Sequence, residues 1–203
     1  MKKYNNKPVI VNDLFSSDTH AKIKLFVNEY IPYIPLCSDI YEKDSILKFN
    51  RKYAHNLDFF VTIHTQLTEF ASEMFNEKVK PSYTFLSLYE DGGQCPLHLD
   101  RPQCRYTIDY LIQQDDTAPW PLNVSDELPQ YELAKLAGFF PDTEDEVNNI
   151  IENNIWNECL LAPNDAACYS GTSSWHYRPT KSKGKVALAF FHFVPESFNG
   201  PLA

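Results

Sequence analysis

The sequence predicts a single α+β domain whose core is mainly β. Three observations predict it: helical periodicity in the first part of the chain, alternating β-forming segments in the second, and an acidic helical block between those segments. A chain of 203 residues with 43% hydrophobic residues suits one domain with a packed core and excludes a disordered chain. Within the single domain 1–203 we expect helical support over 1–80, core strands over 81–125 and 159–195, and an acidic helical insertion over 126–158.

Two amphipathic helices are predicted in the helical support. Over 18–30, apolar residues recur at i, i+3, i+4 and i+7. Over 56–75 a longer apolar stripe follows one helix face, formed by Phe60, Ile63, Leu67, Phe70, Ala71 and Met74. His64 lies beside this stripe, so we expect a packed histidine rather than a ligand. The stretch 37–53 between the two helices shows no clear period.

Four segments after the helical support are typical of β-strands. Residues 83–89 are all β-formers or small, and a turn at 90–93 follows them. In 105–113, one set of side chains alternates with another, as on a pleated strand. A shorter strand is predicted over 120–124, and a strongly apolar one over 185–194. The order of the elements therefore predicts helices first and a β-rich region afterwards.

The insertion 126–158 carries nine acidic side chains and one basic one, Lys135. The tetrapeptide Thr143–Glu146 has the form of a capping box and precedes apolar residues at helical spacing. We therefore expect one or two helices here. A solvated acidic face, a lid over a site and a dimer surface all fit the sequence.

Charge and composition restrict the class of protein. A formal net charge of −9 makes nucleic-acid binding unexpected, because phosphate neutralisation supplies most of that affinity. No apolar run is long enough to cross a membrane, and no apolar stretch follows the basic N-terminal residues, so we expect neither a signal peptide nor a membrane anchor. The expected location is cytoplasmic. Five scattered cysteines without finger spacing predict reduced thiols.

Two histidines and one carboxylate are placed to bind a metal. His98 and Asp100 stand two residues apart in an extended segment, so their side chains point to the same side. His176 lies shortly before the last predicted strand. Two histidines and a carboxylate on one face leave three open positions, which non-haem Fe(II) oxygen chemistry requires. On its own, a His-x-Asp motif is weak, because chance produces it often.

The order of the surrounding segments adds to this motif. Tyr89 and Gly93 precede His98, and the segment 106–111 follows it. Later, 165–171 leads into 175–179, and a strand headed by Gly184 and Lys185 comes next. Over about 83–194 this order resembles the 2-oxoglutarate/Fe(II)-dependent dioxygenase superfamily, closest to its prolyl-hydroxylase-like and related small hydroxylase branches. The resemblance implies a double-stranded β-helix, a cupin-like jelly-roll barrel, with N-terminal supporting helices.

The resemblance also implies roles for single residues. His98, Asp100 and His176 would be the catalytic iron ligands. Lys185 would pair with the far carboxylate of 2-oxoglutarate as a point charge, and its alternative is an exposed lysine at a strand start. Tyr110 would hydrogen-bond the cosubstrate, although a packed core tyrosine fits its position equally well.

Three arginines lie near the proposed site. Arg178 is the substitute for Lys185 as the cosubstrate anchor, and contact with a carboxylate of the substrate fits it equally well. Arg101 and Arg105 would bind an acidic group of the substrate, or lie on the surface. His192 and Trp120 are expected to be core residues.

The expected function is that of an oxidoreductase. It would use Fe(II), O₂ and 2-oxoglutarate to hydroxylate or otherwise oxidise a C–H bond of a small molecule, amino acid or peptide, with release of succinate and CO₂. The carboxylate of Asp100 argues against the halogenating branch of the superfamily. The alternatives are a catalytically silent jelly-roll module that binds proteins through 126–158, and a barrel that uses another metal. The substrate is expected to carry a carboxylate, and a homodimer stays open.

Overall fold

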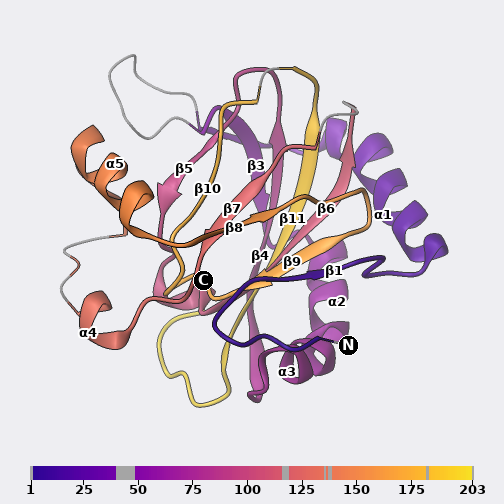
Figure 1. Ribbon diagram of the computed structural model, residues 1–203. Coiled ribbons are helices and arrows are strands. Elements are labelled where there is room, and N and C mark those ends of the chain that lie inside the picture. The colour runs from indigo at the N-terminus through magenta and orange to yellow at the C-terminus, as the bar shows by residue number, and fades with distance from the viewer. Residues whose placement is uncertain are drawn as a thin grey trace.

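The computed structural model describes residues 2–39, 49–115, 119–134, 136, 139–181 and 183–202. Within these residues the strands form two antiparallel sheets (Figure 1). The large sheet contains, in spatial order, β1 (Val9–Val11), β9 (Ala166–Tyr169), β6 (Tyr106–Gln114), β11 (Val186–Pro195), β4 (Val79–Tyr89), β3 (Arg51–His55) and β2 (Cys37–Asp39). The small sheet contains β5 (Cys95–His98), β10 (His176–Arg178), β7 (Leu122–Ser125) and β8 (Trp156–Cys159).

The eight strands from β4 to β11 wind back and forth between the two sheets. The strands β4, β6, β9 and β11 belong to the large sheet, and β5, β7, β8 and β10 belong to the small one. This winding is a double-stranded β-helix, which confirms the predicted jelly-roll core. The predicted strands 83–89, 105–113, 120–124 and 185–194 correspond to β4, β6, β7 and β11, with ends shifted by a few residues.

The large sheet is buried on both faces. Along β11, Val186 and Leu188 pack in the interior between the sheets, whereas Ala187, Ala189 and Phe191 pack against helices on the outer face. Successive side chains of a strand point to opposite faces, so one strand supplies two apolar cores. A side chain on the inner face therefore points into the space between the sheets, whereas one on the outer face packs against the helices.

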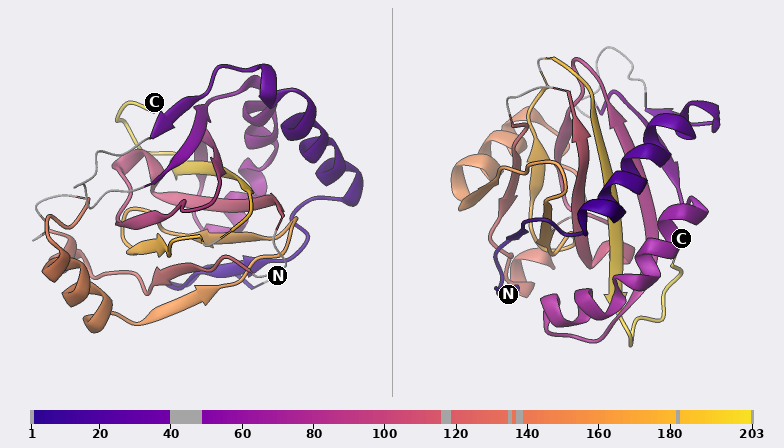
Figure 2. Two further views of the ribbon diagram at one scale, coloured as in Figure 1. Left: turned by 90° about the horizontal axis from the view of Figure 1, so that it is seen from above. Right: turned by 90° about the vertical axis from the view of Figure 1, so that its right-hand side faces the viewer.

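Helices α1 (Ser17–Glu29), α2 (Asp58–Gln66) and α3 (Thr68–Phe75) cover the outer face of the large sheet, and the short 3₁₀ helix η1 (Ile31–Tyr33) follows α1 (Figure 2). The first predicted helix is confirmed within one residue. The second divides at Leu67 into α2 and α3, both of which pack on β4.

The helical support also contains strands that the sequence analysis did not predict. The strands β1, β2 and β3 extend the two edges of the large sheet. Each has five residues or fewer, too few to show a two-residue period. The remainder of the aperiodic stretch, residues 40–48, lies outside the described residues.

The acidic insertion covers the outer face of the small sheet. It contains α4 (Gln130–Leu133) and α5 (Glu144–Asn153), and Thr143 caps α5 by accepting a hydrogen bond from the backbone N–H of Glu146. Apolar residues of both helices pack with Leu97, Leu99 and Trp175. The insertion ends earlier than predicted, because β8 is a core strand. Lys135 lies outside the described residues.

No helix in the described ranges is long and apolar enough to span a membrane. All five cysteines are free thiols, as the sequence predicts.

His64 on α2 is expected to make the fold acid-sensitive. Its side chain is 2% exposed and packs against Phe193, and its Nε2 has no hydrogen-bond partner among the described residues. Burial, assisted by the charge of His192, lowers the pKa of His64 to about 3. The unfolded chain therefore binds the extra proton between pH 6.5 and 3, and the free energy of unfolding falls as the pH drops through that window.

The substitution His64→Leu removes this titration. From pH 7 to pH 4, the loss of stability attributable to His64 is about 3 kcal/mol in the wild type, and the variant should lack it. Urea unfolding at a series of pH values measures the difference. The prediction is wrong if the free energy of unfolding falls by the same amount in both proteins between pH 7 and pH 4.

Candidate active site

The two histidines stand side by side on the small sheet. His98 ends β5 and His176 begins β10, and the two residues are direct partners in the antiparallel register. Asp100 follows β5 two residues later, beyond the sheet edge. The fold therefore brings together all three residues that the sequence analysis selected as metal ligands.

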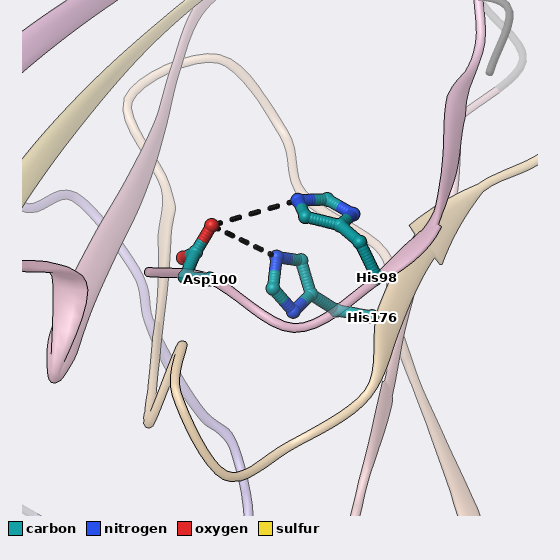
Figure 3. A group of neighbouring side chains, drawn as sticks. All are labelled: His98, Asp100 and His176. Atoms are coloured by element: carbon teal, nitrogen blue, oxygen red, sulfur yellow. Dashed lines mark ion pairs between the residues drawn. The ribbon is translucent and has the colours of Figure 1, made fainter. Parts of the chain in front are cut away.

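The ligand atoms of the three side chains converge on one point (Figure 3). Asp100 Oδ1 lies 3.5 Å from His98 Nε2 and 3.7 Å from His176 Nε2. The other ring nitrogens bond to backbone carbonyls: His98 Nδ1 to Pro96 at 2.7 Å, and His176 Nδ1 to Ser174 at 2.9 Å. When Nδ1 carries the hydrogen, Nε2 presents a lone pair, and such outer bonds fix the orientation of metal-binding histidines.

The charges of the group are strongly coupled. Burial and the neighbouring His98 lower the pKa of His176 to about 4. Burial alone would lower the pKa of His98, but Cys95 and Asp100 raise it to about 10. Burial likewise opposes ionisation of Asp100, yet His176 and His98 hold the pKa of its carboxyl group below the usual value. The carboxylate is therefore stabilised by positive charge at the position that a cation would occupy.

Gly171, in the turn after β9, and Thr107 of the large sheet hold Asp100 in place. Its backbone N–H donates to the carbonyl of Gly171 at 2.8 Å. Thr107 on β6 donates its hydroxyl to Asp100 Oδ2 at 3.4 Å and contacts His192 Nδ1 at 3.1 Å. A Cβ on Gly171 would lie 2.3 Å from Asp100 Oδ2 and 2.6 Å from the carbonyl oxygen of Cys104, so only glycine fits there.

The three ligand atoms fit a divalent transition metal. Two neutral imidazoles and one carboxylate on one side of the ion form the facial set of non-haem Fe(II) sites. A second cluster pairs Asp100 with Cys104 and His192. Burial raises the pKa of the Cys104 thiol, which contacts the Tyr83 hydroxyl at 2.9 Å.

The triad lies at a cavity of about 430 Å³ with aromatic walls. The rings come from the large sheet, from the segment just before β3 and from the insertion, namely Phe49, Tyr83, Phe85, Phe139, Phe140, Tyr169 and Phe190. The ring of Phe140 stacks on that of His98, with centroids 5.3 Å apart and planes 9° apart. The carbonyl of Phe139 accepts a hydrogen bond from the backbone N–H of Leu99. The insertion therefore forms part of the cavity wall.

The structure does not bring Lys185 to the triad. Its side chain is 71% exposed and lies 3.8 Å from Glu90 Oε1. It borders a separate cavity on the outer side of the large sheet, with Asn28 and Gln113. Lys185 stands two residues before Ala187, so the two side chains share the outer face of the sheet. The exposed lysine that the sequence analysis kept as an alternative is the observed arrangement.

Tyr110 is also on the outer face. It is fully buried in the core formed with the helices. Its hydroxyl lies 2.6 Å from His20 Nδ1 and 3.2 Å from Asn164 Oδ1, and Phe15 packs edge-on against its ring. Tyr110 therefore stabilises the contact between α1 and β6, away from the cavity.

Two of the three arginines have structural partners. Arg178 is buried between the sheets and donates to Asp109 Oδ2 at 2.7 Å and to the carbonyl of Trp120 at 2.8 Å. Arg105 forms an ion pair with Glu127 at 2.8 Å. Arg101 lines the cavity, and its guanidinium carbon lies 5.1 Å from the centre of the Tyr83 ring. Of the predicted arginines, Arg101 is the one that lines the cavity of the triad.

Arg105 is expected to stabilise the loop before His176. Besides Glu127, it donates to the hydroxyls of Ser170, Thr172 and Ser173. Replacing Arg105 by methionine leaves the carboxylate of Glu127, 13% exposed, without its cation, which should lower the free energy of unfolding by about 2–3 kcal/mol. Chemical denaturation measures this loss.

The double variant Arg105→Met/Glu127→Gln is the control for that prediction. It should recover part of the lost stability, because no charge is then left unpaired. An unchanged stability in Arg105→Met, together with weaker substrate binding, would favour the substrate role that the sequence analysis assigned to Arg105.

Sequence reasoning missed several residues of the cavity. Arg51 lies in a stretch without periodicity, and Phe139 and Phe140 lie in an insertion that shows only a helix signal. His192 was assigned to the core, yet it lines the cavity and contacts the threonine that holds Asp100. Phe190 and His192 stand two residues apart on β11, in the same series as the inner-face residues Val186 and Leu188. This two-residue spacing is the signal that would have placed both on the inner face.

Comparisons with known proteins show similarity in fold without similarity in sequence. No protein-family model matches the sequence, and no curated protein matches it. Among solved structures, the chain is similar to the non-haem α-ketoglutarate-dependent carbocyclase SnoK from nogalamycin biosynthesis, with TM-score 0.73, 8% identity and coverage of 92% of this chain and 79% of the other. It is also similar to EctD from S. alaskensis with bound Fe, with TM-score 0.68, 13% identity and coverage of 96% and 75%.

A third similar structure is HygX from Streptomyces hygroscopicus with nickel and 2-oxoglutarate bound, with TM-score 0.64, 9% identity and coverage of 95% and 84%. At these identities the comparisons establish the fold alone, which the chain shares with SnoK, EctD and HygX. The metal triad rests on the geometry described above.

Proposed function

We propose that this protein is an Fe(II)- and 2-oxoglutarate-dependent oxygenase that hydroxylates a C–H bond of a small molecule. The overall change would convert substrate, O₂ and 2-oxoglutarate into hydroxylated substrate, succinate and CO₂. One observation carries the proposal: His98 Nε2, His176 Nε2 and Asp100 Oδ1 converge at an aromatic cavity inside a fold shared with such oxygenases. Bound iron would supply the activation of O₂, which no side chain of the chain provides.

The residues of the chain would supply binding, orientation and exclusion of water. His98 and His176 are held at Nδ1, so the Nε2 atom of each ring points toward the metal position, and His98 would release its Nε2 proton when the metal binds. Phe140 covers the face of His98, and the other rings of the cavity restrict access of water to the reacting centre.

The cavity favours a substrate with an apolar body and an anionic group. Its aromatic walls would pack the apolar part. Arg101, next to Asp100 in the chain, would pair with a carboxylate or phosphate of the substrate, because the guanidinium fork matches both. The carbocyclase SnoK shows that the fold also supports outcomes other than hydroxylation, so product analysis decides which oxidation occurs.

An anaerobic titration tests the proposal. Fe(II) followed by 2-oxoglutarate should give the wild type the weak visible charge-transfer band of the chelate, with about one iron per chain. The band should be absent in His176→Ala, whereas His20→Ala, on the outer side of the large sheet, should keep it.

The outcomes separate the candidate functions. Metal binding without a 2-oxoglutarate band would support a barrel with other metal chemistry. A wild type that retains neither iron nor 2-oxoglutarate would refute the oxygenase and favour a protein-binding module.

A further inference from the structure

A second group of metal-ligating side chains meets the triad at Asp100. One ligand atom each from Asp100, Cys104 and His192 lies within 4.8 Å of the other two. Cys104 is 1% exposed and His192 is 6% exposed, so this is an interior group rather than a surface cluster. A thiolate, an imidazole and a carboxylate are the three ligand types that zinc takes in proteins. The proposed oxygenase reaction uses neither Cys104 nor His192.

Three separate elements bring the group together. Asp100 follows β5, and Cys104 ends the short 3₁₀ helix η2 (Pro102–Cys104), whose single turn carries the chain back toward Asp100. His192 lies on β11, where it is the direct partner of Thr107 on β6. The arrangement therefore rests on the same framework that holds the triad.

A hydrogen-bond relay orients the ring of His192. The hydroxyl of Thr107 has one hydrogen, which it donates to Asp100 Oδ2 at 3.4 Å. At its contact of 3.1 Å with His192 Nδ1 it must then accept, so Nδ1 carries the hydrogen of the ring. His192 Nε2 consequently presents a lone pair, as the Nε2 of a metal-binding histidine does.

The surroundings of Cys104 are suited to a thiolate beside a cation. Burial and the charge of Asp100 raise the pKa of the Cys104 thiol, whereas the Tyr83 hydroxyl, 2.9 Å from its Sγ, and Arg101 lower it. A divalent ion between Asp100 and Cys104 would reverse the effect of the carboxylate, because it places positive charge between the two negative groups. The thiol proton would leave to solvent as the metal–sulfur bond forms.

The cavity gives an ion access to this group. Asp100 and His192 both line the cavity of about 430 Å³, and Cys104 lies behind them with Tyr83. Cys95 lines the same cavity, but among the described residues Cys104 is the cysteine that meets both a carboxylate and an imidazole.

We propose that Cys104, His192 and Asp100 form a second metal site, which binds Zn(II). Thiolate ligands select zinc, whereas the two imidazoles and the carboxylate of the triad suit iron. Three protein ligands leave the fourth position of a tetrahedral zinc ion for water. The site requires no 2-oxoglutarate, so it stands independently of the proposed function.

Co(II) is the spectroscopic probe for this site. It takes the place of zinc and gives a near-ultraviolet charge-transfer band when a thiolate is bound. The triad contains no thiolate, so the band reports on Cys104. In an anaerobic titration of the reduced chain, both the wild type and His176→Ala should show the band, and Zn(II) should remove it by displacing Co(II). Cys104→Ser should show no band.

Calorimetry with Zn(II) measures the affinity of the site. In the His176→Ala background, where the triad lacks one ligand, about one Zn(II) should still bind per chain. Adding Cys104→Ser should lower the zinc affinity by about 100-fold or more, because loss of a ligand exceeds the roughly 10–100-fold cost of losing a group that only orients one. Adding His192→Gln, which keeps the thiol, should also weaken zinc binding.

The matched control is Cys95→Ser, the same change at another thiol of the cavity. It should keep both the Co(II) band and the zinc affinity, and far-ultraviolet circular dichroism should show that every variant folds. A band that persists in Cys104→Ser, or is lost in Cys95→Ser, would overturn the inference. A wild type with the chelate band of Fe(II) and 2-oxoglutarate but no Co(II)–thiolate band would overturn this inference alone. The opposite result would support the zinc site and refute the oxygenase.

Discussion

Replacing Asp100 by asparagine should lower the affinity for Fe(II) by more than about 100-fold and abolish succinate formation. Loss of groups that only orient ligands typically costs 10–100-fold, and Asp100 would itself be a ligand in the proposed site. Its Oδ1 faces the Nε2 atoms of both His98 and His176, so the neutral amide would remove the negative charge at the point where the three side chains meet. Metal titration followed by a succinate assay measures both effects.

The matched control for this change is Asp145→Asn. Asp145 lies exposed in the first turn of α5, so the same loss of charge occurs on the surface of the insertion. Iron affinity and turnover should stay at the wild-type level there. Full turnover in Asp100→Asn would show that the triad is assigned incorrectly.

The substitution Gly171→Ala should lower Fe(II) affinity by about 10–100-fold, although Gly171 is no ligand. The added methyl group would lie 2.3 Å from Asp100 Oδ2 and 2.9 Å from Thr107 Oγ1, so the carboxylate must move. The backbone carbonyl of Cys104, at 2.6 Å, blocks the alternative shift. Calorimetric metal binding, together with far-ultraviolet circular dichroism to check folding, measures the effect.

The adjacent variant Thr172→Ala serves as its control. It removes only a contact of 3.3 Å with Arg105 and leaves Asp100 untouched. Iron affinity should therefore be unchanged. If Gly171→Ala binds iron as tightly as wild type, the carboxylate is less constrained than the close contacts indicate.

The sequence allowed β4, β6, β7 and β11 and the pairing of His98 with Asp100 to be predicted, because each depends on a local pattern. The strong β-formers of β4 and β11 and the His-x-Asp spacing each lie within a few residues. His176 was found through its neighbours in the chain. The division of the second predicted helix at Leu67, in contrast, leaves its apolar stripe intact and gives no signal in the periodicity.

The cosubstrate residues were placed incorrectly for a physical reason. The strands β6 and β11 are buried on both faces, so the alternation of apolar residues cannot tell the inner face from the outer one. A change of one residue in register transfers a side chain to the other face, and the pairing of β11 with β6 is irregular between Ala187 and Leu188. The expected cosubstrate roles of Lys185 and Tyr110 require the inner face of the large sheet, whereas both residues lie on its outer face.

Arg51 was missed because its position depends on partners distant in sequence. It reaches the cavity through cross-strand pairing with Tyr89, 38 residues away, and no local pattern encodes that pairing. The aromatic residues Phe139 and Phe140 were missed for the same reason, since their contacts with Leu99 and His98 form only when the insertion folds back.

The triad is held from both sheets: β5 and β10 of the small sheet present the histidines, whereas Thr107 on β6 of the large sheet donates to the carboxylate of Asp100, and the carbonyl of Gly171, just after β9, accepts from its backbone N–H. An ion bound there would tie the two sheets together at the mouth of the cavity. Its binding free energy then adds to the stability of the folded chain. Protein without iron should open first at this edge and be degraded sooner, so the abundance of the protein in a cell would follow the iron supply.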